Sequence, residues 1–301
     1  MNLRYVEYFL ATIEHHGMRR AALALHVPQP SLSHGLRSLE RELGVTLFRR
    51  VGQQMLVSPE GRAFVRPARQ LLRDSAIACS AVASAVGVAG GRLDLVTEPA
   101  VAADPTASLI GAFRRQNPQV RVNLSTAVPE VPLTRSVSDG RCEVGIGYLP
   151  QPPTSLEQYK IGEHEVVLLM PPGSPDPGET VALESLTDQP MIVVPRGSAQ
   201  RDFFDKLLAE AGVRTRIAVQ VAHREAILPM VLAGAGSTLI PRPRVEAAVE
   251  RGAMVRSLSP PVRRPIGLFH RRGHLSPVAT RFKALAVDGD GSSSPPKGEA
   301  P

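Results

Sequence analysis

The chain has 301 residues, more than one typical domain and enough for two hydrophobic cores. Its net charge is +7, and most of the positive charge is arginine. Such a balance favours a polyanionic partner, although a GC-rich genome gives the same composition. The two cysteines, Cys79 and Cys142, are far apart and form no CxxC pair, so the sequence indicates neither a disulfide framework nor a zinc site.

The sequence shows no targeting or membrane-spanning signal. The opening segment, MNLRYVEYFLATIEHH, has neither a long apolar core nor a small-residue cleavage site. No stretch reaches the apolar length that a bilayer-spanning helix needs. We therefore expect a cytoplasmic protein without a membrane partner.

Three helices are predicted near the N-terminus. Apolar residues recur at helical spacing from Leu3 to Ile13, and an alanine-rich second helix covers Met18–Leu25. The third helix begins near Pro30, which suits a first helical turn. Its apolar face is a regular leucine stripe, formed by Leu32, Leu36, Leu39 and Leu43.

The opposite face of this third helix is polar and basic, because His34, Arg37 and Arg41 point away from the leucine stripe. After it, the short runs Leu47–Arg50 and Met55–Val57 flank Gly52-Gln53-Gln54 and predict two strands and a turn. This segment would form a small wing beside the helices.

A long helix is predicted next. Ser58-Pro59-Glu60 combines a cap residue, a proline at the first position and an acid in the first turn. An apolar stripe continues to about Val86, and we expect Pro67 to kink the helix. A helix of this length outside a compact domain needs a partner, most simply its copy in a second subunit.

From residue 92 onward, short β-branched runs alternate with helical stretches, which predicts an α/β architecture with largely parallel sheets. The predicted strands are Arg92–Val96, Val120–Leu124, Glu143–Tyr148, Val166–Met170, Met191–Val194, Ile217–Val221, Ser237–Ile240 and Pro265–Phe269. The predicted helices are Pro105–Gln116, Arg201–Ala211 and Ala226–Ala233. The final segment is rich in Gly, Ser and Pro and is expected to be disordered.

Several motifs resemble one protein family in residue type and in order. They are Ala21–Ser33, Leu36, Leu39-Glu40, Leu43–Val45, Leu47–Arg50, Ser58–Gly61, Arg114–Val122, Asp139–Ile146, Pro195–Ser198 and Ala233–Pro241. On these residues the chain resembles the LysR-type transcriptional regulators from its N-terminus to about residue 285.

The resemblance implies an α/β protein with a winged helix-turn-helix DNA-binding domain at 1–58, a dimerising linker helix at 59–88 and a periplasmic-binding-protein-like effector domain at 92–287. That domain would hold subdomain I (92–161 and 268–287) and subdomain II (162–267), joined by crossovers near Ile161–Glu165 and Arg264–Leu268. A disordered tail would cover 288–301.

The resemblance also implies partners. Members assemble as homodimers or homotetramers and bind double-stranded promoter DNA, with RNA polymerase as a candidate further partner. They respond to a small molecule bound between the subdomains, here unidentified. No cofactor, metal or catalytic residue is expected.

The chain departs from the family pattern at the predicted DNA contacts. Met18 stands where the family often has a capping Ser or Thr after Gly17, and His34-Gly35 replaces the usual basic or glutamine pair. Gly35 inside a helix costs about 1 kcal/mol relative to alanine. The preferred DNA sequence should therefore not be taken from relatives.

We expect the third helix to enter the major groove, where its N-terminal residues meet base edges. Gln29 can read adenine, and Arg37 can pair with guanine or a phosphate. The arginines outside this helix would contact phosphates and set the register. The expected DNA contacts are Arg19, Arg20, Gln29, Pro30, Ser31, Ser33, His34, Arg37, Arg49 and Arg50.

Effector contacts are expected beyond the carboxyl ends of the predicted strands. The expected set is Thr97, Glu98, Ala100, Thr126, Val128, Arg196, Gly197, Ser198 and His223. The charge of Glu98 counts against a carboxylate effector unless an arginine such as Arg196 compensates. Ordinary loop capping is the alternative role for each of these residues.

Three other functions were weighed. An enzyme is disfavoured because the sequence lacks GxSxG, GxxxxGK[ST], HExxH and GxGxxG motifs. A solute-binding module without regulatory action is disfavoured by the helix-turn-helix. A regulator whose cleft is filled by side chains and needs no effector stays open, and ligand-induced melting shifts would distinguish it.

Overall fold

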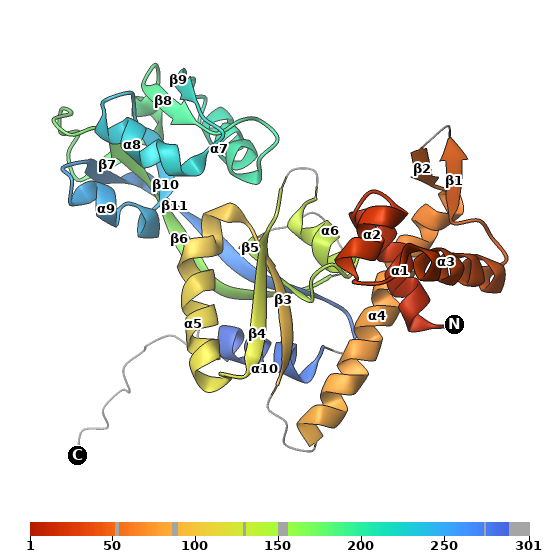
Figure 1. Cartoon of the computed structure of the whole chain (residues 1–301). Helices are drawn as coiled ribbons and strands as arrows, with labels where there is room; N and C mark the ends of the chain where they lie inside the picture. Colours follow the sequence, from red (N-terminus) through yellow and green to blue (C-terminus); the bar gives the residue numbers. More distant parts are fainter. Residues whose placement is uncertain (52–53, 86–89, 129–130, 150–155, 274, 289–301) are drawn as a thin grey trace, which may run out of the picture.

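The computed structural model describes residues 1–51, 54–85, 90–128, 131–149, 156–273 and 275–288. Figure 1 shows three parts in chain order: a small N-terminal domain, the long helix α4 (Pro59–Ala85) and a C-terminal domain with two lobes. Two long strands, β6 (Leu156–Met170) and β11 (Met254–Arg271), run from one lobe into the other.

The N-terminal domain contains α1 (Leu3–Glu14), α2 (Met18–Ala24) and α3 (Gln29–Leu43), followed by the antiparallel hairpin β1 (Phe48–Val51) and β2 (Gln54–Val57). Leu32, Leu36 and Leu39 of α3 are buried against Phe9 of α1 and its neighbours. The predicted leucine stripe therefore faces the core, and the three helices with their wing are confirmed. Gly52 and Gln53 of the predicted turn lie outside the described residues.

Helix α4 begins where the sequence predicts. The Ser58 hydroxyl accepts a hydrogen bond from the backbone N–H of Gly61 at 2.8 Å and donates one to the carbonyl of Thr46 at 2.6 Å. A Cβ at Gly61 would lie 2.2 Å from the carbonyl oxygen of Leu47, so this start requires glycine. The helix continues through Pro67 and buries Ala68 in the N-terminal core.

Subdomain I is the lobe beside α4. Its strands β3 (Gly91–Thr97), β4 (Val120–Thr126) and β5 (Val144–Tyr148) are parallel, with β3 in the middle. Its helices are α5 (Ala107–Gln116), α6 (Leu133–Ser138) and α10 (Pro277–Asp288). Phe113 of α5 and Phe282 of α10 meet edge to face in its core.

Subdomain II is the second lobe. Its strands are β7 (Thr180–Ala182), β8 (Pro190–Val193), β9 (Arg216–Gln220) and β10 (Thr238–Pro241). Its helices are α7 (Ala199–Glu210), α8 (Ile227–Leu232) and α9 (Glu246–Val249), with short turns η3 (Leu183–Leu186), η4 (Arg224–Ala226) and η5 (Arg242–Arg244). Two apolar clusters form its core, one on each side of the β6–β10 pair.

The connection between the subdomains is an antiparallel ladder between β6 and β11, with register shifts between Ser257 and Val262 and between Ile266 and Gly267. Ile161, Ile266 and Leu268 belong to the core of subdomain I, whereas Val166 and Val262 pack in subdomain II. The change from the core of subdomain I to that of subdomain II thus lies between Ile161 and Val166 on β6 and between Val262 and Ile266 on β11.

The expectation of largely parallel sheets is wrong for the strands that join the lobes. The pairs β6–β11, β5–β11 and β6–β10 are antiparallel, because the chain passes between the lobes twice in opposite directions. No helix among the described residues is long and apolar enough to cross a membrane. The expected disordered tail beyond Asp288 lies outside the described residues.

Candidate DNA-binding face and ligand site

The predicted DNA-reading residues lie on one exposed surface of α3. Gln29, Pro30, Ser31, His34 and Arg37 are exposed, and Ser33 is half-buried. Helix α3 begins after Pro28 with no side-chain cap, and the backbone N–H of Ser31 donates to the carbonyl of Pro28 at 3.0 Å. An exposed helix start with donors of this kind has the geometry that inserts into a major groove.

Gly35 lies on the opposite, buried side of the same helix. A Cβ at this position would come within 2.7 Å of the rings of both Tyr5 and Tyr8 in α1. Glycine therefore lets α3 approach α1 closely, and the cost in helix propensity is offset by this packing. Of the two residues His34 and Gly35, which stand where the family usually has a basic or glutamine pair, only His34 is therefore on the exposed face.

The remaining predicted DNA contacts are also exposed. Arg19 and Arg20 lie in the first turn of α2, which begins after Gly17 without a side-chain cap, as the sequence suggests. Arg49 and Arg50 lie on the exposed strand β1, and Arg49 is 3.6 Å from Glu60. An exposed pair at this distance leaves Arg49 free to turn toward a phosphate.

Arg4 was missed by the sequence analysis. Its guanidinium lies 5.8 Å from the ring centroid of Tyr8. It also lines a surface hollow together with Pro30, Ser31 and His34. No sequence pattern marks Arg4, because only the packing of α1 on α3 brings this residue from the chain start beside the reading helix.

A second group of polar side chains lies between the two subdomains, and we call it the inter-subdomain cluster: Glu98, Tyr148, Arg224, Arg244 and Arg264. Arg264 is only 6% exposed, and its guanidinium lies 3.6 Å from the ring centroid of Tyr148. On its other side the ring centroid of Phe203, in α7, is 3.9 Å away. Burial lowers the pKa of Arg264, and the two rings hold a cation between the subdomains.

A chain of hydrogen bonds continues from Tyr148. Its hydroxyl lies 2.9 Å from Nδ1 of His164, and Nε2 of His164 lies 2.9 Å from a carboxylate oxygen of Asp104. His164 is 2% exposed and sits on β6 at the change between the cores. Burial raises the pKa of Tyr148 to about 12, so this hydroxyl stays protonated and donates or accepts within the chain.

The arginines of the cluster come mainly from subdomain II. Arg224 in η4 donates to the side-chain oxygen of Gln200, and burial lowers the pKa of Arg224. Nη1 of Arg244 is buried without a hydrogen-bond partner among the described residues. Charge interactions across the boundary link Arg224 with Glu98 and Tyr148, and Arg244 with Tyr148. The cluster therefore holds more cationic than anionic groups, even with the neighbouring Glu225 included.

The predicted effector residues of subdomain I do not lie in one site. Glu98 belongs to the cluster, and Tyr148 donates a backbone hydrogen bond of 3.3 Å to its carboxylate. Thr97 is fully buried with its hydroxyl 3.2 Å from that of Thr106, and Ala100 is also buried. Thr126 lines a different cavity beside α4, and Val128 is exposed.

The predicted effector residues of subdomain II lie around the start of α7 and of η4. Ser198 caps α7 by accepting from the backbone N–H of Arg201 at 3.3 Å, the alternative role considered above. Arg196 and Gly197 are exposed, and Arg196 lines a hollow within subdomain II. His223 is exposed and precedes Arg224. The arginines whose charges interact with Glu98 are thus Arg224 and Arg264 rather than Arg196.

Neither site has the donor set of a metal centre. Among the described residues no group of three or more His, Cys, Asp or Glu side chains could hold an ion. The chemistry that the two sites offer is recognition: cationic and hydrogen-bonding groups on α3, and buried guanidinium groups between the subdomains.

Two family descriptions match the chain. "LysR substrate binding domain" matches residues 86–290, and "Bacterial regulatory helix-turn-helix protein, lysR family" matches residues 3–62. The DNA-binding transcriptional dual regulator OxyR of Escherichia coli (strain K12) is 28% identical over 289 residues, covering 95% of this chain and 94% of the relative. A hydrogen peroxide-inducible genes activator of Dickeya chrysanthemi is 29% identical over 290 residues, with 95% and 94% covered.

Solved structures agree with these matches. A full-length OxyR variant from Pseudomonas aeruginosa superposes with a TM-score of 0.75 at 23% identity and covers 100% of this chain and 99% of its own. Full-length CbnR complexed with its target DNA gives a TM-score of 0.65 at 25% identity, covering 96% and 100%. Fold, reading helix and both family matches agree: the chain belongs to the LysR-type transcriptional regulators, with a DNA-binding helix-turn-helix and an effector-binding domain.

Proposed function

We propose that the chain recognises its operator through the exposed start of α3, with Gln29, Ser31, His34 and Arg37 at base edges. Arg19, Arg20, Arg49 and Arg50 would contact phosphates, and Arg4 would join them from α1. The observation that carries this proposal is the one-sided exposure of α3, whose opposite face is buried against α1. CbnR, a relative of similar fold, was solved with its target DNA.

Selection of bound fragments from the source genome tests this proposal. Wild-type protein should enrich a small set of promoter fragments with paired sites, because members of the family bind as dimers of dimers. A variant that carries Arg37→Ala should lose this enrichment. Equal enrichment by both proteins would contradict the assignment of α3 as the reading helix.

We also propose that the effector is a small organic anion held by the inter-subdomain cluster. The observation that carries this is the unpartnered, buried Nη1 of Arg244 beside Arg224 and Arg264. A carboxylate can take two parallel hydrogen bonds from one guanidinium. An anion here would contact both lobes and stabilise one arrangement of them.

Melting-temperature shifts across a panel of carboxylates, each paired with its neutral amide, test this second proposal. A specific ligand at one hundred times its Kd stabilises the fold by about 2.7 kcal/mol. A carboxylate that binds the cluster should raise the melting temperature, its amide should not, and Arg244→Gln should abolish the shift by that carboxylate. A shift by neither class would favour a regulator that needs no effector.

Relatives are named for induction by hydrogen peroxide, but we propose a different signal for this chain. Peroxide oxidises thiolates. Cys142 is buried, and burial raises the pKa of its thiol, which disfavours the thiolate. Cys79 lies on α4, and neither cysteine belongs to the inter-subdomain cluster.

The assembly and compartment are further proposals. We propose a dimer through α4, because this long helix keeps exposed side chains such as Val82 beyond its contacts with the N-terminal core. Pairs of dimers would form the tetramer. A regulator of promoters acts where the DNA lies, so we propose a cytoplasmic location. Analytical ultracentrifugation should give a mass of twice or four times the chain, and a monomer would contradict it.

A further inference from the structure

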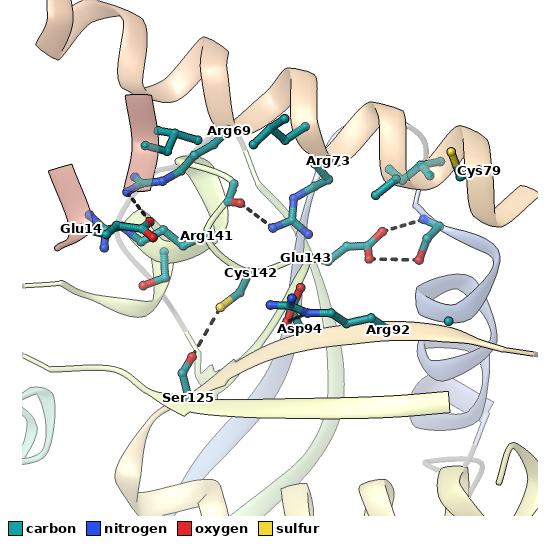
Figure 2. A pocket seen from close by; sticks show the side chains of 18 of the residues that line it. Glu14, Arg69, Arg73, Cys79, Arg92, Asp94, Ser125, Arg141, Cys142 and Glu143 are labelled. Carbon is teal, nitrogen blue, oxygen red and sulfur yellow. Dashed lines mark hydrogen bonds and ion pairs between the residues drawn. The ribbon is translucent and has the colours of Figure 1, made fainter. Parts of the chain in front are cut away.

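A cavity of about 960 Å³ lies where three parts of the chain meet, apart from both sites described above. Its walls come from the end of α1, from one face of α4 and from the loop before β5 in subdomain I (Figure 2). Its volume lies in the upper range of small-molecule sites. We call it the junction cavity.

Two arginines of α4 reach away from the helix: Arg69 toward Glu14 of α1, and Arg73 toward the loop before β5 in subdomain I (Figure 2). Arg69 is 7% exposed; its Nη2 is 3.5 Å from the carboxylate of Glu14, and its Nη1 is buried without a partner among the described residues. Arg73 donates to the carbonyl of Gly140, and its Nε is likewise buried and unpartnered. A buried charged donor left without an acceptor is costly, and both arginine side chains line the cavity.

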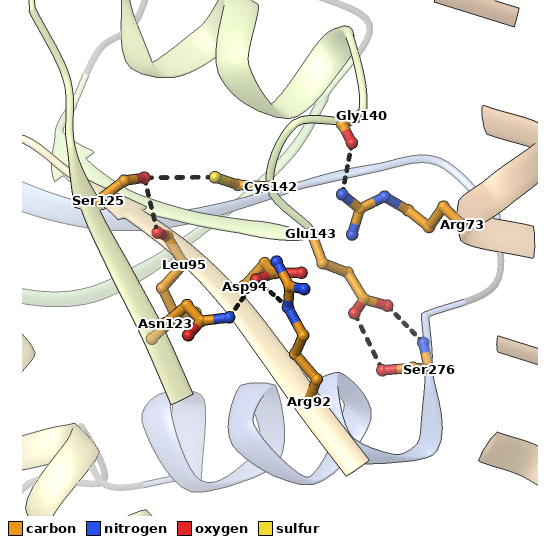
Figure 3. A network of polar contacts seen from close by, with 10 residues as sticks. All are labelled: Arg73, Arg92, Asp94, Leu95, Asn123, Ser125, Gly140, Cys142, Glu143 and Ser276. Atoms are coloured by element: carbon orange, nitrogen blue, oxygen red, sulfur yellow. Dashed lines mark hydrogen bonds and ion pairs between the residues drawn. The ribbon is translucent and has the colours of Figure 1, made fainter. Parts of the chain in front are cut away.

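Among the carboxylates that line the cavity, Glu14 pairs with Nη2 of Arg69 only, and the other two are engaged elsewhere. Asp94 accepts from Arg92 at 2.7 Å and from Asn123 at 2.9 Å (Figure 3). Glu143 accepts from the backbone N–H and the hydroxyl of Ser276, at 2.6 and 3.0 Å. Burial first, and then the nearby charge of Arg141, lower the pKa of Arg69.

We propose that the junction cavity binds a small organic carboxylate. Its carboxylate would accept from the free donors of Arg69 and Arg73, since guanidinium groups bind carboxylates through directed pairs of hydrogen bonds. Its apolar body would lie against Leu72, Ala76 and Ile77, which line the same cavity. An occupied cavity contacts both the N-terminal domain and subdomain I, so it fixes their relative orientation and thereby changes operator binding.

Benzoate is a suitable probe, with benzyl alcohol as a neutral molecule of the same shape. The protein itself supplies a reporter, because both of its cysteines line the junction cavity. On the full-length protein, benzoate should raise the melting temperature in a saturable way and slow alkylation of Cys79 about fivefold or more, as site occupancy requires. Benzyl alcohol should do neither.

Substitutions separate this cavity from the inter-subdomain cluster. Arg69→Lys and Arg73→Lys keep the charge but remove the forked donors, so both effects of benzoate should be lost. Arg66→Lys, also on α4 but outside this cavity, and Arg244→Gln in the cluster should keep both effects. Ala76→Trp fills the cavity while keeping both arginines, and it should also abolish both effects if the lysine variants fold poorly.

Several outcomes would overturn the proposal. They are the absence of any benzoate effect, an equal effect of benzyl alcohol, and loss of the effect in Arg244→Gln with retention in Arg69→Lys. If Cys79 were protected from alkylation without benzoate, and this protection disappeared on dilution, a second copy of the chain would occupy the cavity instead. The proposed effector at the inter-subdomain cluster would stand in each of these cases.

Discussion

The guanidinium of Arg264 lies 3.9 Å from the ring centroid of Phe203, so a residue of the connecting strand β11 is stacked on a helix of subdomain II. Tyr148 covers its other face from subdomain I. A lysine at this position keeps the charge but not the planar stacking. We predict that Arg264→Lys lowers the free energy of unfolding in urea by about 2 kcal/mol, the size of a buried cation–π contact.

The neighbouring Arg263→Lys is the matched control for this experiment. Arg263 is 66% exposed and forms a surface ion pair of 2.7 Å with Glu163. Its substitution should change the free energy of unfolding by less than about 0.5 kcal/mol. Similar effects of the two substitutions would argue against a special role for the stacked guanidinium.

Two helix glycines should respond to alanine with opposite signs. Gly35→Ala places a methyl group 2.7 Å from two tyrosine rings and should destabilise the N-terminal domain by about 1–3 kcal/mol through overpacking. At Gly111 in α5 the nearest group is the tip of Arg115 at 3.7 Å. There alanine should stabilise by up to about 1 kcal/mol through helix propensity. Thermal unfolding of both variants measures the difference, and a stabilising Gly35→Ala would refute the close-packing explanation.

Arg37 and Arg49 should affect DNA binding in different ways. Arg37→Ala should weaken operator binding by about 1–3 kcal/mol and leave binding to random DNA nearly unchanged. Arg49→Ala should weaken both and reduce the slope of log K against log salt by about 1. Titrations by fluorescence anisotropy at fixed and at varied salt separate the two. Arg115→Ala, on the far domain, is the control and should bind as wild type.

Glu165 should make stability depend on pH in the acid range. It accepts hydrogen bonds from Arg242 at 2.6 and 3.1 Å, and these lower its pKa to about 2. Because this folded-state pKa lies below the unfolded value, the pair stabilises the fold above about pH 4.5 and the contribution is lost as the pH falls toward 2. Because the side chain of Arg242 is 44% exposed, solvent screens the ion pair, and we expect it to contribute about 1 kcal/mol to the free energy of unfolding. In urea unfolding at pH 7 and pH 3, Glu165→Gln should lose more stability at pH 7 than at pH 3; an equal loss at both would rule out this linkage.

The two thiols should differ in reactivity. Burial both shields Cys142 and raises the pKa of its thiol, whereas Cys79 is exposed. We predict that iodoacetamide at pH 7.5 modifies Cys142 slower than Cys79 on the order of tenfold, because the thiolate is the reactive form. Peptide mass spectrometry over time gives both rates in one sample. Equal rates would mean that the loop before β5 opens readily.

The N-terminal domain was predictable because its signals are local. The leucine spacing of α3 and the Ser58 cap of α4 each lie within one turn or one helix, and both appear in the structure as expected. Gly35 was interpreted only as a cost to the helix, since the tyrosines that explain it are about thirty residues away in α1.

The inter-subdomain cluster was largely missed because its contacts join distant parts of the chain. Arg264 lies between Tyr148 and Phe203, and no spacing in the sequence links these three. The strands β6 and β11 were recognised only in their apolar segments. Their polar segments, such as Glu157–Lys160, are strands because they pair with residues around Gly267, more than one hundred positions later.

The β6–β11 ladder makes subdomain II an insertion within subdomain I. The chain leaves through Gly162 and returns through Ile266, which are paired neighbours on adjacent strands. A tight turn that replaces residues 163–265 would therefore close subdomain I without spanning a gap, and its core residues Ile161, Ile266 and Leu268 would all be retained. Subdomain II, which supplies most of the arginines of the cluster, is thus a separable insertion. Replacing it should leave the fold of subdomain I and of the DNA-binding domain unchanged.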